Sequence, residues 1–180
     1  MIFLVNRKLK IFGITTLVLL LLVGIASASQ ESQALVKKGN ILGVAKQYDD
    51  AISTFNKAIS LDPQDADAWF YKGVALSQEH KISEANVAID HALLLNPDNS
   101  NYNVGKSLLL GFQGKYGDAE NYVDKGLMLD PNNSGGWNAK GLIAFSKGDA
   151  AEAIFDYKKA IELNPDNTDA LKHLHKLEHP

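Results

Sequence analysis

Four copies of one short motif, spaced 34 residues apart, constrain the fold of this chain more than any other feature of its sequence. Each copy places a leucine and an aspartate or asparagine before one of the prolines Pro63, Pro97, Pro131 and Pro165. Because proline cannot continue a helix and restricts its predecessor, each copy predicts the end of a helix. The residues just after each proline are favourable N-caps for a following helix, namely Asp65, Asn99 or Ser100, Asn133 or Ser134, and Asn167 or Thr168. A fixed period of this length is typical of a repeat protein.

Alignment on the prolines divides most of the chain into four equal repeats, residues 32–65, 66–99, 100–133 and 134–167. Small residues recur at three places of the repeat, counted from its first residue. The eighth place holds Gly39, Gly73, Ser107 and Gly141. The twentieth is always alanine (Ala51, Ala85, Ala119, Ala153), and the twenty-seventh is Ala58, Ala92, Gly126 and Ala160. Apolar residues follow three- and four-residue steps, which indicate amphipathic helices. Each repeat is therefore predicted to be an antiparallel helix pair, with the small residues where the helices approach most closely.

This framework, with Trp69 and Trp137 at the fourth place, resembles the tetratricopeptide repeat. The resemblance covers residues 32–167 and implies an all-α, right-handed α-solenoid of four helix hairpins. The first helices would line a concave groove and the second helices would lie outside. The third repeat departs most from the family pattern, with Asn103 for the aromatic residue, Ser107 for glycine and several added glycines. It is therefore expected to be the least stable of the four repeats.

Residues 168–180 are predicted to form a C-terminal capping helix, because a repeat array needs a polar-backed element to cover its last open face. Ala170, Leu171, Leu174 and Leu177 form its apolar stripe. The charged and histidine side chains between them, His173 included, are expected to face away from the repeats.

The first 28 residues differ from the rest and resemble a secretory signal. Arg7, Lys8 and Lys10 precede an apolar run that ends in the small residues 26–28. Two readings stay open, a cleaved signal peptide or a membrane anchor formed by residues 11–28, whose 18 residues are short for a membrane span. Residues 29–31 would be a short linker. Either reading predicts a secreted or extracytoplasmic protein that meets a membrane through this segment alone.

The composition argues against several classes of function. Without the first 28 residues the chain has 15 basic and 21 acidic side chains, and this acidic balance disfavours a nucleic-acid partner. The absence of cysteine excludes disulfides and thiolate sites. Acidic residues such as Asp124, Glu152 and Asp156 are expected on outer faces and turns, where they would not converge for acid–base chemistry. The sequence therefore predicts no enzyme, no cofactor and no metal site, although His175 and His179 share one helical face.

The predicted function is to bind a partner protein or peptide in the concave groove, without catalysis. In the family that the sequence resembles, ligand contacts come chiefly from the second, fifth, ninth and twelfth places of the first helices. The resemblance thus implies twelve partner-binding residues: Val36, Asn40, Phe70, Val74, Ser77, Asn101, Val104, Leu108, Asn138, Leu142, Phe145 and Lys172. The alternative is a purely structural role, in which several of them pack against neighbouring repeats and contact no ligand. The basic clamp with which many relatives hold a C-terminal carboxylate is absent.

A rival hypothesis is a structural subunit that forms homo-oligomers through the open face of the first repeat. One modification pattern also occurs, an N-glycosylation sequence at Asn132 on a predicted turn between repeats. The turn chemistry of this stretch explains the same residues without a glycan.

Overall fold

The computed structural model describes the backbone of residues 2–179 and the side chains of residue 18 and residues 22–179. Within this part of the chain there are nine α-helices and no strand. The helices are α1 (Ile2–Val44), α2 (Tyr48–Leu61), α3 (Ala66–Gln78), α4 (Ile82–Leu95), α5 (Ser100–Phe112), α6 (Tyr116–Leu129), α7 (Ser134–Lys147), α8 (Ala150–Leu163) and α9 (Thr168–Glu178).

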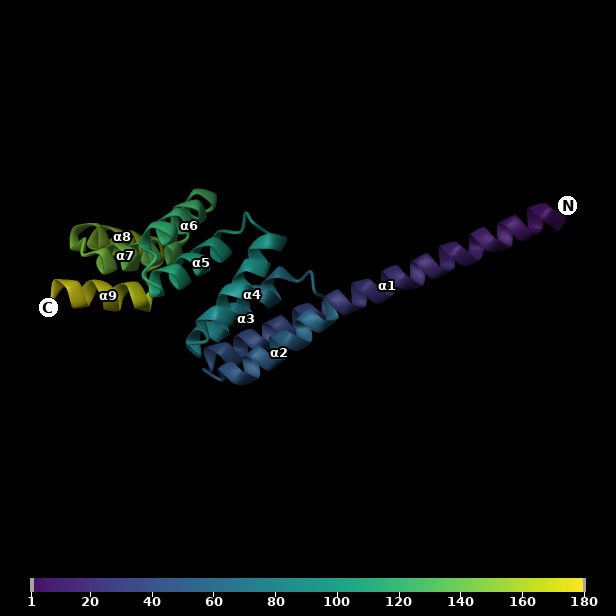
Figure 1. The fold of residues 1–180 in the computed structure, drawn as a ribbon, viewed down its shortest axis with the longest axis horizontal. Helices are drawn as coiled ribbons and strands as arrows, with labels where there is room; N and C mark the ends of the chain where they lie inside the picture. Colours follow the sequence, from purple (N-terminus) through teal and green to yellow (C-terminus); the bar gives the residue numbers. More distant parts are fainter. Residues whose placement is uncertain (1, 180) are drawn as a thin grey trace.

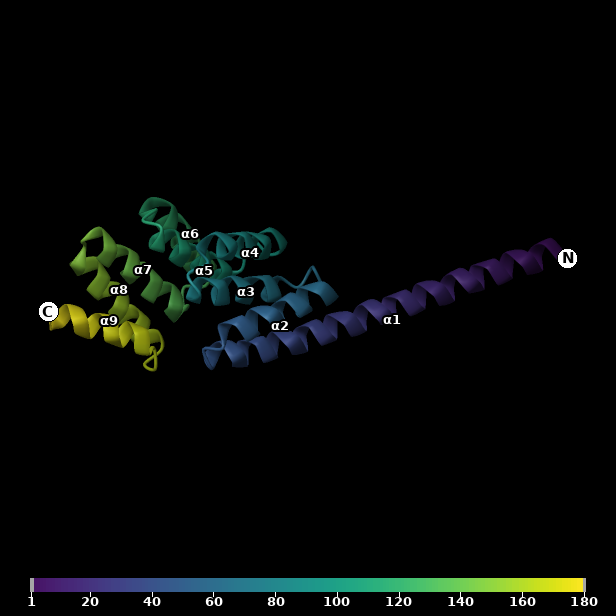
Figure 2. The ribbon, with the colours of Figure 1, turned by 60° about the horizontal axis from the view of Figure 1, so that its bottom comes forward.

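The helices pair in chain order. α1 packs on α2, α3 on α4, α5 on α6 and α7 on α8, while α9 packs on α8 at the C-terminal end. Figures 1 and 2 show these hairpins stacked in sequence, with the N-terminal part of α1 projecting away from the stack. The prediction of an all-α repeat solenoid is confirmed.

The residue that ends each repeat caps the next helix, and in three repeats it also makes a second contact. Asp65 Oδ1 accepts a hydrogen bond from the backbone N–H of Ala68, and Asn99, Asn133 and Asn167 cap α5, α7 and α9 in the same way, as the sequence predicts. Three of them also bond the first residue of their own repeat. These bonds join Ser32 Oγ to Asp65 Oδ2 at 2.7 Å, Asn133 Nδ2 to Ser100 Oγ at 2.9 Å, and Asn167 Nδ2 to Ser134 Oγ at 2.7 Å.

Each hairpin turns through one residue with a positive φ angle at the fifteenth place of its repeat. In the last two repeats this residue is glycine, Gly114 or Gly148, which reaches this region without steric cost. In the first two repeats it is Lys46 or His80, with φ of 60° and 58°. Non-glycine residues are uncommon in this region, so we attribute the positive φ angles of Lys46 and His80 to the tight turn between the two helices.

The small residues lie where the paired helices touch. The alanines at the twentieth place are 0% exposed in all four repeats. A Cβ atom added at Gly39 would lie 2.5 Å from Phe55 Cε1, and one at Gly141 would lie 2.7 Å from the ring of Tyr157. In the second repeat a Cβ atom at Gly73 would lie 2.6 Å from Ile89 Cγ1, so the eighth place has to be small because a large side chain of the second helix fills the space beside it.

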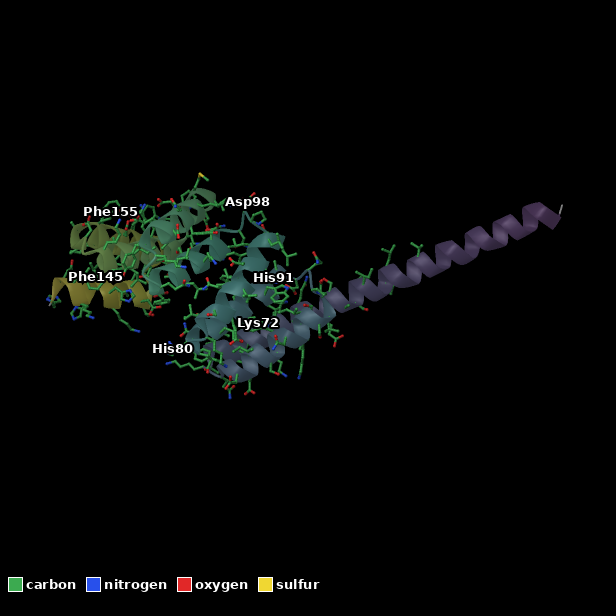
Figure 3. The ribbon with its side chains drawn as sticks, viewed as in Figure 1. Lys72, His80, His91, Asp98, Phe145 and Phe155 are labelled. Carbon is green, nitrogen blue, oxygen red and sulfur yellow. The ribbon has the colours of Figure 1, made fainter. Side chains whose placement is uncertain are left out.

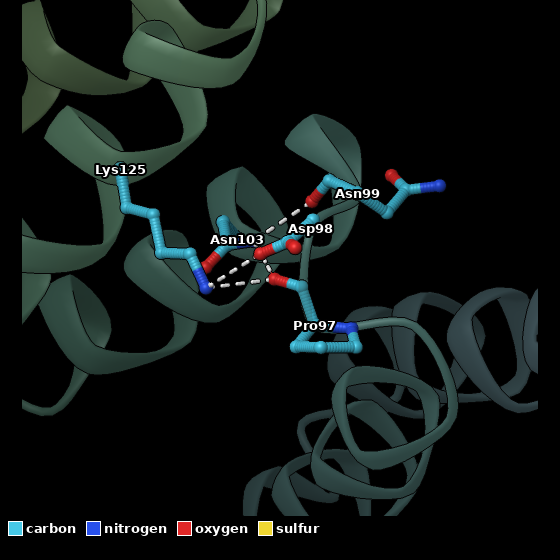
Figure 4. A network of polar contacts seen from close by, with 5 residues as sticks. All are labelled: Pro97, Asp98, Asn99, Asn103 and Lys125. Carbon is cyan, nitrogen blue, oxygen red and sulfur yellow. Dashed lines mark hydrogen bonds and ion pairs between the residues drawn. The ribbon is translucent and has the colours of Figure 1, made fainter.

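The third repeat keeps one hydrogen bond of the second and fourth repeats, although it lacks their tryptophan. The indole N–H of Trp69 donates to the Pro63 carbonyl oxygen, and that of Trp137 donates to Pro131. In the third repeat Asn103 Nδ2 donates to the equivalent carbonyl, Pro97, at 3.0 Å, and also to the Asn99 carbonyl (Figure 4). The buried Asn103 Oδ1 has no partner among the described residues. Asn103 thus replaces the indole's hydrogen bond but not its volume.

Two side chains expected on outer faces lie inward instead. His173 of α9 packs against Tyr157 and Asn138. Asp156 of α8 is 1% exposed, and its Oδ2 has no hydrogen-bond partner in the described part of the chain. The expectation for Asp156 was wrong because it follows Ala153 by three residues and precedes Ala160 by four, and both alanines lie on the buried face of the same helix.

The predicted signal or anchor, residues 1–28, lies mostly outside the residues whose side chains the structure describes. Within the described residues, no helix is both long enough and apolar enough to span a membrane. Residues 29–31, expected to form a linker, are helical and continue α1 into the first repeat. Asn132, in the glycosylation pattern, is exposed on the turn between α6 and α7, where its backbone N–H bonds Asp130 Oδ1.

Candidate groove for a partner segment

The first helices of the hairpins border several cavities. The largest, 480 Å³, lies between α1, α2 and α3 and is called here the α1–α3 cavity. Gly43 of α1 leaves it open, because nothing lies within 4 Å of a Cβ atom at this position, and Gly39 borders it beside the ring of Phe55. Its walls are mainly apolar and aromatic: Val44, Tyr48, Phe55, Tyr71, Val74 and Ala75, with the amides of Asn40 and Gln78. This size and lining are typical of a pocket that receives an apolar group.

A second cavity, 260 Å³, lies beside it between α1 and α3 and is more polar. Asn40 and Tyr71 border both cavities, and the carboxylates of Asp65 and Asp67 line the second one together with Lys37. Asp67 Oδ1 accepts a 2.5 Å hydrogen bond from the hydroxyl of Tyr102 on α5. Burial raises the pKa of Tyr102, and the bond to Asp67 raises it further, so that this hydroxyl stays protonated and holds α3 to α5.

The α3–α5 junction, in the middle of the predicted groove, is closed by packing. The ring of Phe70 stacks on that of Tyr102 with centroids 4.8 Å apart. Gly105 makes room for this, since a Cβ atom there would lie 2.6 Å from Phe70 Cε2. Phe70 is therefore part of the core and not a free groove residue.

Two further cavities lie beyond this junction. One of 70 Å³ is lined by Leu108 of α5 and Leu142 of α7, among others. The other, 290 Å³, lies between α7, α8 and α9 and is called here the α7–α9 cavity. Leu142 and Ser146 border both, so the two cavities adjoin along α7. The groove thus consists of two parts, one on each side of the α3–α5 junction.

The twelve sequence-predicted residues fall into three groups. Val36, Phe70 and Val104 are buried, although Val36 still borders the more polar cavity. Asn40, Val74, Leu108, Leu142 and Phe145 line cavities. The other four make contacts within the chain: Ser77 bonds the Val74 carbonyl, Asn101 accepts from Asn133, Asn138 meets His173, and Lys172 lies 3.9 Å from Asp169.

The sequence reasoning missed several residues that line the cavities, chiefly Tyr71 and His173 at the sixth place and Tyr48 at the start of α2. The sixth place follows the fifth by one residue, and its two rings contact the preceding hairpin, Tyr71 at Phe55 and His173 at Tyr157. A repeat-by-repeat comparison of this place would have drawn attention to its two large polar rings. Within the described residues, no group of three or more His, Cys, Asp or Glu side chains is placed to hold a metal ion.

The sequence comparisons agree with this architecture. Residues 135–167 match the family model described as tetratricopeptide repeat, and residues 39–79 match one described as TPR repeat. These two segments are tetratricopeptide repeats. Such repeats generally mediate protein–protein interactions and are typically not catalytic. Among curated proteins, no match to the sequence was found.

Several solved tetratricopeptide repeat proteins share the fold. A structure from the characterisation of pilF of Pseudomonas aeruginosa superimposes with a TM-score of 0.72 at 20% identity, over 84% of this chain and 69% of that one. A chain of the APC/C hetero-tetramer Cut9–Hcn1 gives 0.75 at 18% identity, over 85% of this chain but 32% of its own length. MamA from Desulfovibrio magneticus gives 0.62 at 16% identity, over 82% and 83%. At such identities the likeness concerns the fold alone.

Proposed function

We propose that this protein is a non-catalytic scaffold that holds a segment of a partner polypeptide along the face formed by its first helices. The observation that carries the proposal is the α1–α3 cavity, which Gly43 of α1 leaves open and apolar side chains line. An apolar depression edged by amides suits a polypeptide, because its side chains can be buried while the amides of Asn40 and Gln78 bond its main chain. The hetero-tetramer formed by Cut9 and Hcn1 gives a precedent for assembly by a protein of this fold.

A displayed peptide library, selected on the immobilised full chain in mild detergent, tests the proposal. Gly43→Leu should fill the α1–α3 cavity without a clash, because nothing lies within 4 Å of a Cβ atom at this position. Phe145→Ala removes an apolar wall of the α7–α9 cavity. We expect one or both changes to weaken the selected peptides about tenfold or more, since loss of a buried apolar anchor costs this much.

Phe155→Ala is the matched control. Phe155 on α8 is 64% exposed, against 44% for Phe145 on α7, and it lines none of the four cavities (Figure 3). Peptides that are lost with Phe155→Ala but kept by both groove variants would refute the groove as the binding surface.

Self-association is the second candidate function, and one observation favours it. On α1 the side chains of Ile41 and Val44 are 70% and 87% exposed, so the first repeat presents an apolar surface at the end of the stack. If this surface joins two copies, the mass measured by sedimentation should rise with concentration, and Ile41→Lys should abolish the rise. A monomer at all concentrations would exclude this role.

We extend the proposal to location: residues 1–28 direct the repeats out of the cytoplasm, and when retained they tether them to a membrane. The support is the basic and apolar pattern of the sequence. Because α1 runs without a break from Ile2 to Val44, a retained segment would hold the first repeat on a stiff helix. The mass of the chain isolated from its native membrane and soluble fractions tests this, and an intact chain in the cytoplasmic fraction would contradict it.

A further inference from the structure

The α7–α9 cavity combines an apolar floor with a cationic edge. Leu142 and Phe145 of α7, Tyr157 of α8 and Leu177 of α9 supply the apolar part. Lys176 of α9 stands at the edge, and it forms no ion pair with any residue that the structure describes. The residues that line this cavity include no carboxylate.

His173 is the other ionisable group of this edge. Its Nδ1 lies 3.2 Å from Asn138 Oδ1, a contact that pairs a donor with an acceptor when Nδ1 carries the proton. Nε2 then remains as an acceptor in the neutral ring and becomes a second donor when the ring is protonated. The ring also lies against Tyr157, with centroids 5.3 Å apart, so its orientation is fixed from both sides.

The opposite end of the groove has the opposite charge. There the two carboxylates of Asp65 and Asp67 line the same cavity as the single ammonium group of Lys37. A negatively charged group on a bound segment is therefore favoured beside α9 and disfavoured beside α1.

We propose that the α7–α9 cavity receives a large apolar side chain of a partner segment, and that Lys176 binds the carboxylate of an acidic residue next to it. This deepens the proposed function and rests on it. The carboxylate belongs to a side chain within the segment, because a second cavity adjoins this one at Leu142 and Ser146, so a bound chain meets further surface along α7. Protonated His173 adds a second donor, so binding strengthens as the pH falls.

The charges around His173 set the pH range of this effect. Burial lowers the pKa of His173 below its ordinary value, Asp169 raises it, and Lys176 and Lys172 lower it further. Tyr157 and Asn138, from α8 and α7, face the ring as neutral groups. A bound carboxylate would raise the pKa of His173 again, so that proton uptake and peptide binding favour each other.

Peptides selected from the displayed library on the full chain test this inference. The selected sequences should pair a large apolar residue with Asp or Glu, and a synthetic, end-capped copy should lose affinity when its acid is replaced by the amide. Lys176→Gln should weaken the acidic peptide about two- to fivefold at low salt and leave the amide peptide unchanged, as expected for one exposed ion pair. Lys115→Gln, the same change at an exposed lysine that lines none of the cavities, should leave both unchanged.

The pH dependence supplies a second readout. The affinity of the acidic peptide should increase as the pH falls from about 7.5 to about 5.5, across the titration range of histidine. His173→Gln should remove this increase even if it changes the overall affinity.

The outcomes separate the two proposals. Peptides that depend on Gly43 or Phe145 but show no preference for an acidic residue, and no response to Lys176→Gln, would overturn this inference and leave the proposed function standing. Failure to select any peptide that depends on the groove residues would overturn both.

Discussion

Asp156 gives the most specific stability prediction. Burial raises the pKa of its carboxyl from 3.8 to about 6, while Lys140 opposes this rise and the carboxylates of Glu152 and Asp124 add to it. Since the pKa is higher in the folded than in the unfolded chain, protonation favours folding. Below about pH 4 Asp156 is therefore protonated in both states and does not lower the free energy of unfolding. As the pH rises through about 6, ionisation of Asp156 lowers this free energy. A shift of about two pKa units corresponds to about 3 kcal/mol in the free energy of unfolding.

Asp156→Asn keeps the shape of the side chain but removes its ionisation. The free energy of unfolding of the variant, minus that of the unchanged protein, should rise by about 3 kcal/mol between pH 4 and pH 7. Urea unfolding followed by far-ultraviolet circular dichroism at several pH values measures it, and groups that titrate alike in both proteins cancel in the difference. Asp156→Ala should show the same trend, because Ala88 occupies the equivalent place of the second repeat. A difference that stays constant from pH 4 to pH 7 would refute the reasoning.

Three further predictions concern packing and hydrogen bonding within the repeats. Gly39→Ala should lower the free energy of unfolding by about 1–3 kcal/mol in urea titrations, because the new Cβ atom overlaps Phe55. Gly43→Ala, in open space, should raise it by up to about 1 kcal/mol, and equal effects at the two sites would contradict the packing described. Asn103→Ala should cost about 1–3 kcal/mol, since the two hydrogen bonds that its amide donates to the carbonyls of Pro97 and Asn99 are lost, and should speed hydrogen exchange in α5; unchanged exchange would argue against it. Ala153→Leu should lower stability by about 1–3 kcal/mol through overpacking of α7 and α8, and an unchanged melting temperature would show that the contact is misplaced.

The architecture could be predicted from the sequence because its determinants are local. Proline stops a helix whatever surrounds it, and the Asp or Asn two residues later caps the next one through a bond three residues away. The small residues recur at fixed places because two helices of the same hairpin meet there in every repeat.

The candidate site was harder to predict, because it depends on contacts between hairpins. Phe70 occupies a groove place by sequence, but the missing side chain of Gly105 on the next hairpin lets its ring pack inward. The sequence places His173 outside, because it lies off the apolar stripe of its helix together with Lys172 and Lys176, whereas Tyr157 and Asn138 of the preceding hairpin hold it inward. Asp156 differs from these two, since its spacing from Ala153 and Ala160 was sufficient to place it on the inner face.

The two bonds made by the last residue of the first, third and fourth repeats have a consequence for how such a chain can change in length. Asn133 ties the beginning of its own hairpin to the beginning of the following one. Loss or gain of a single amino acid between Ser100 and Asn133 would break one of these ties, whereas duplication of a whole hairpin would preserve them all. Growth or shortening of the array by entire units is thus the route that keeps every cap satisfied.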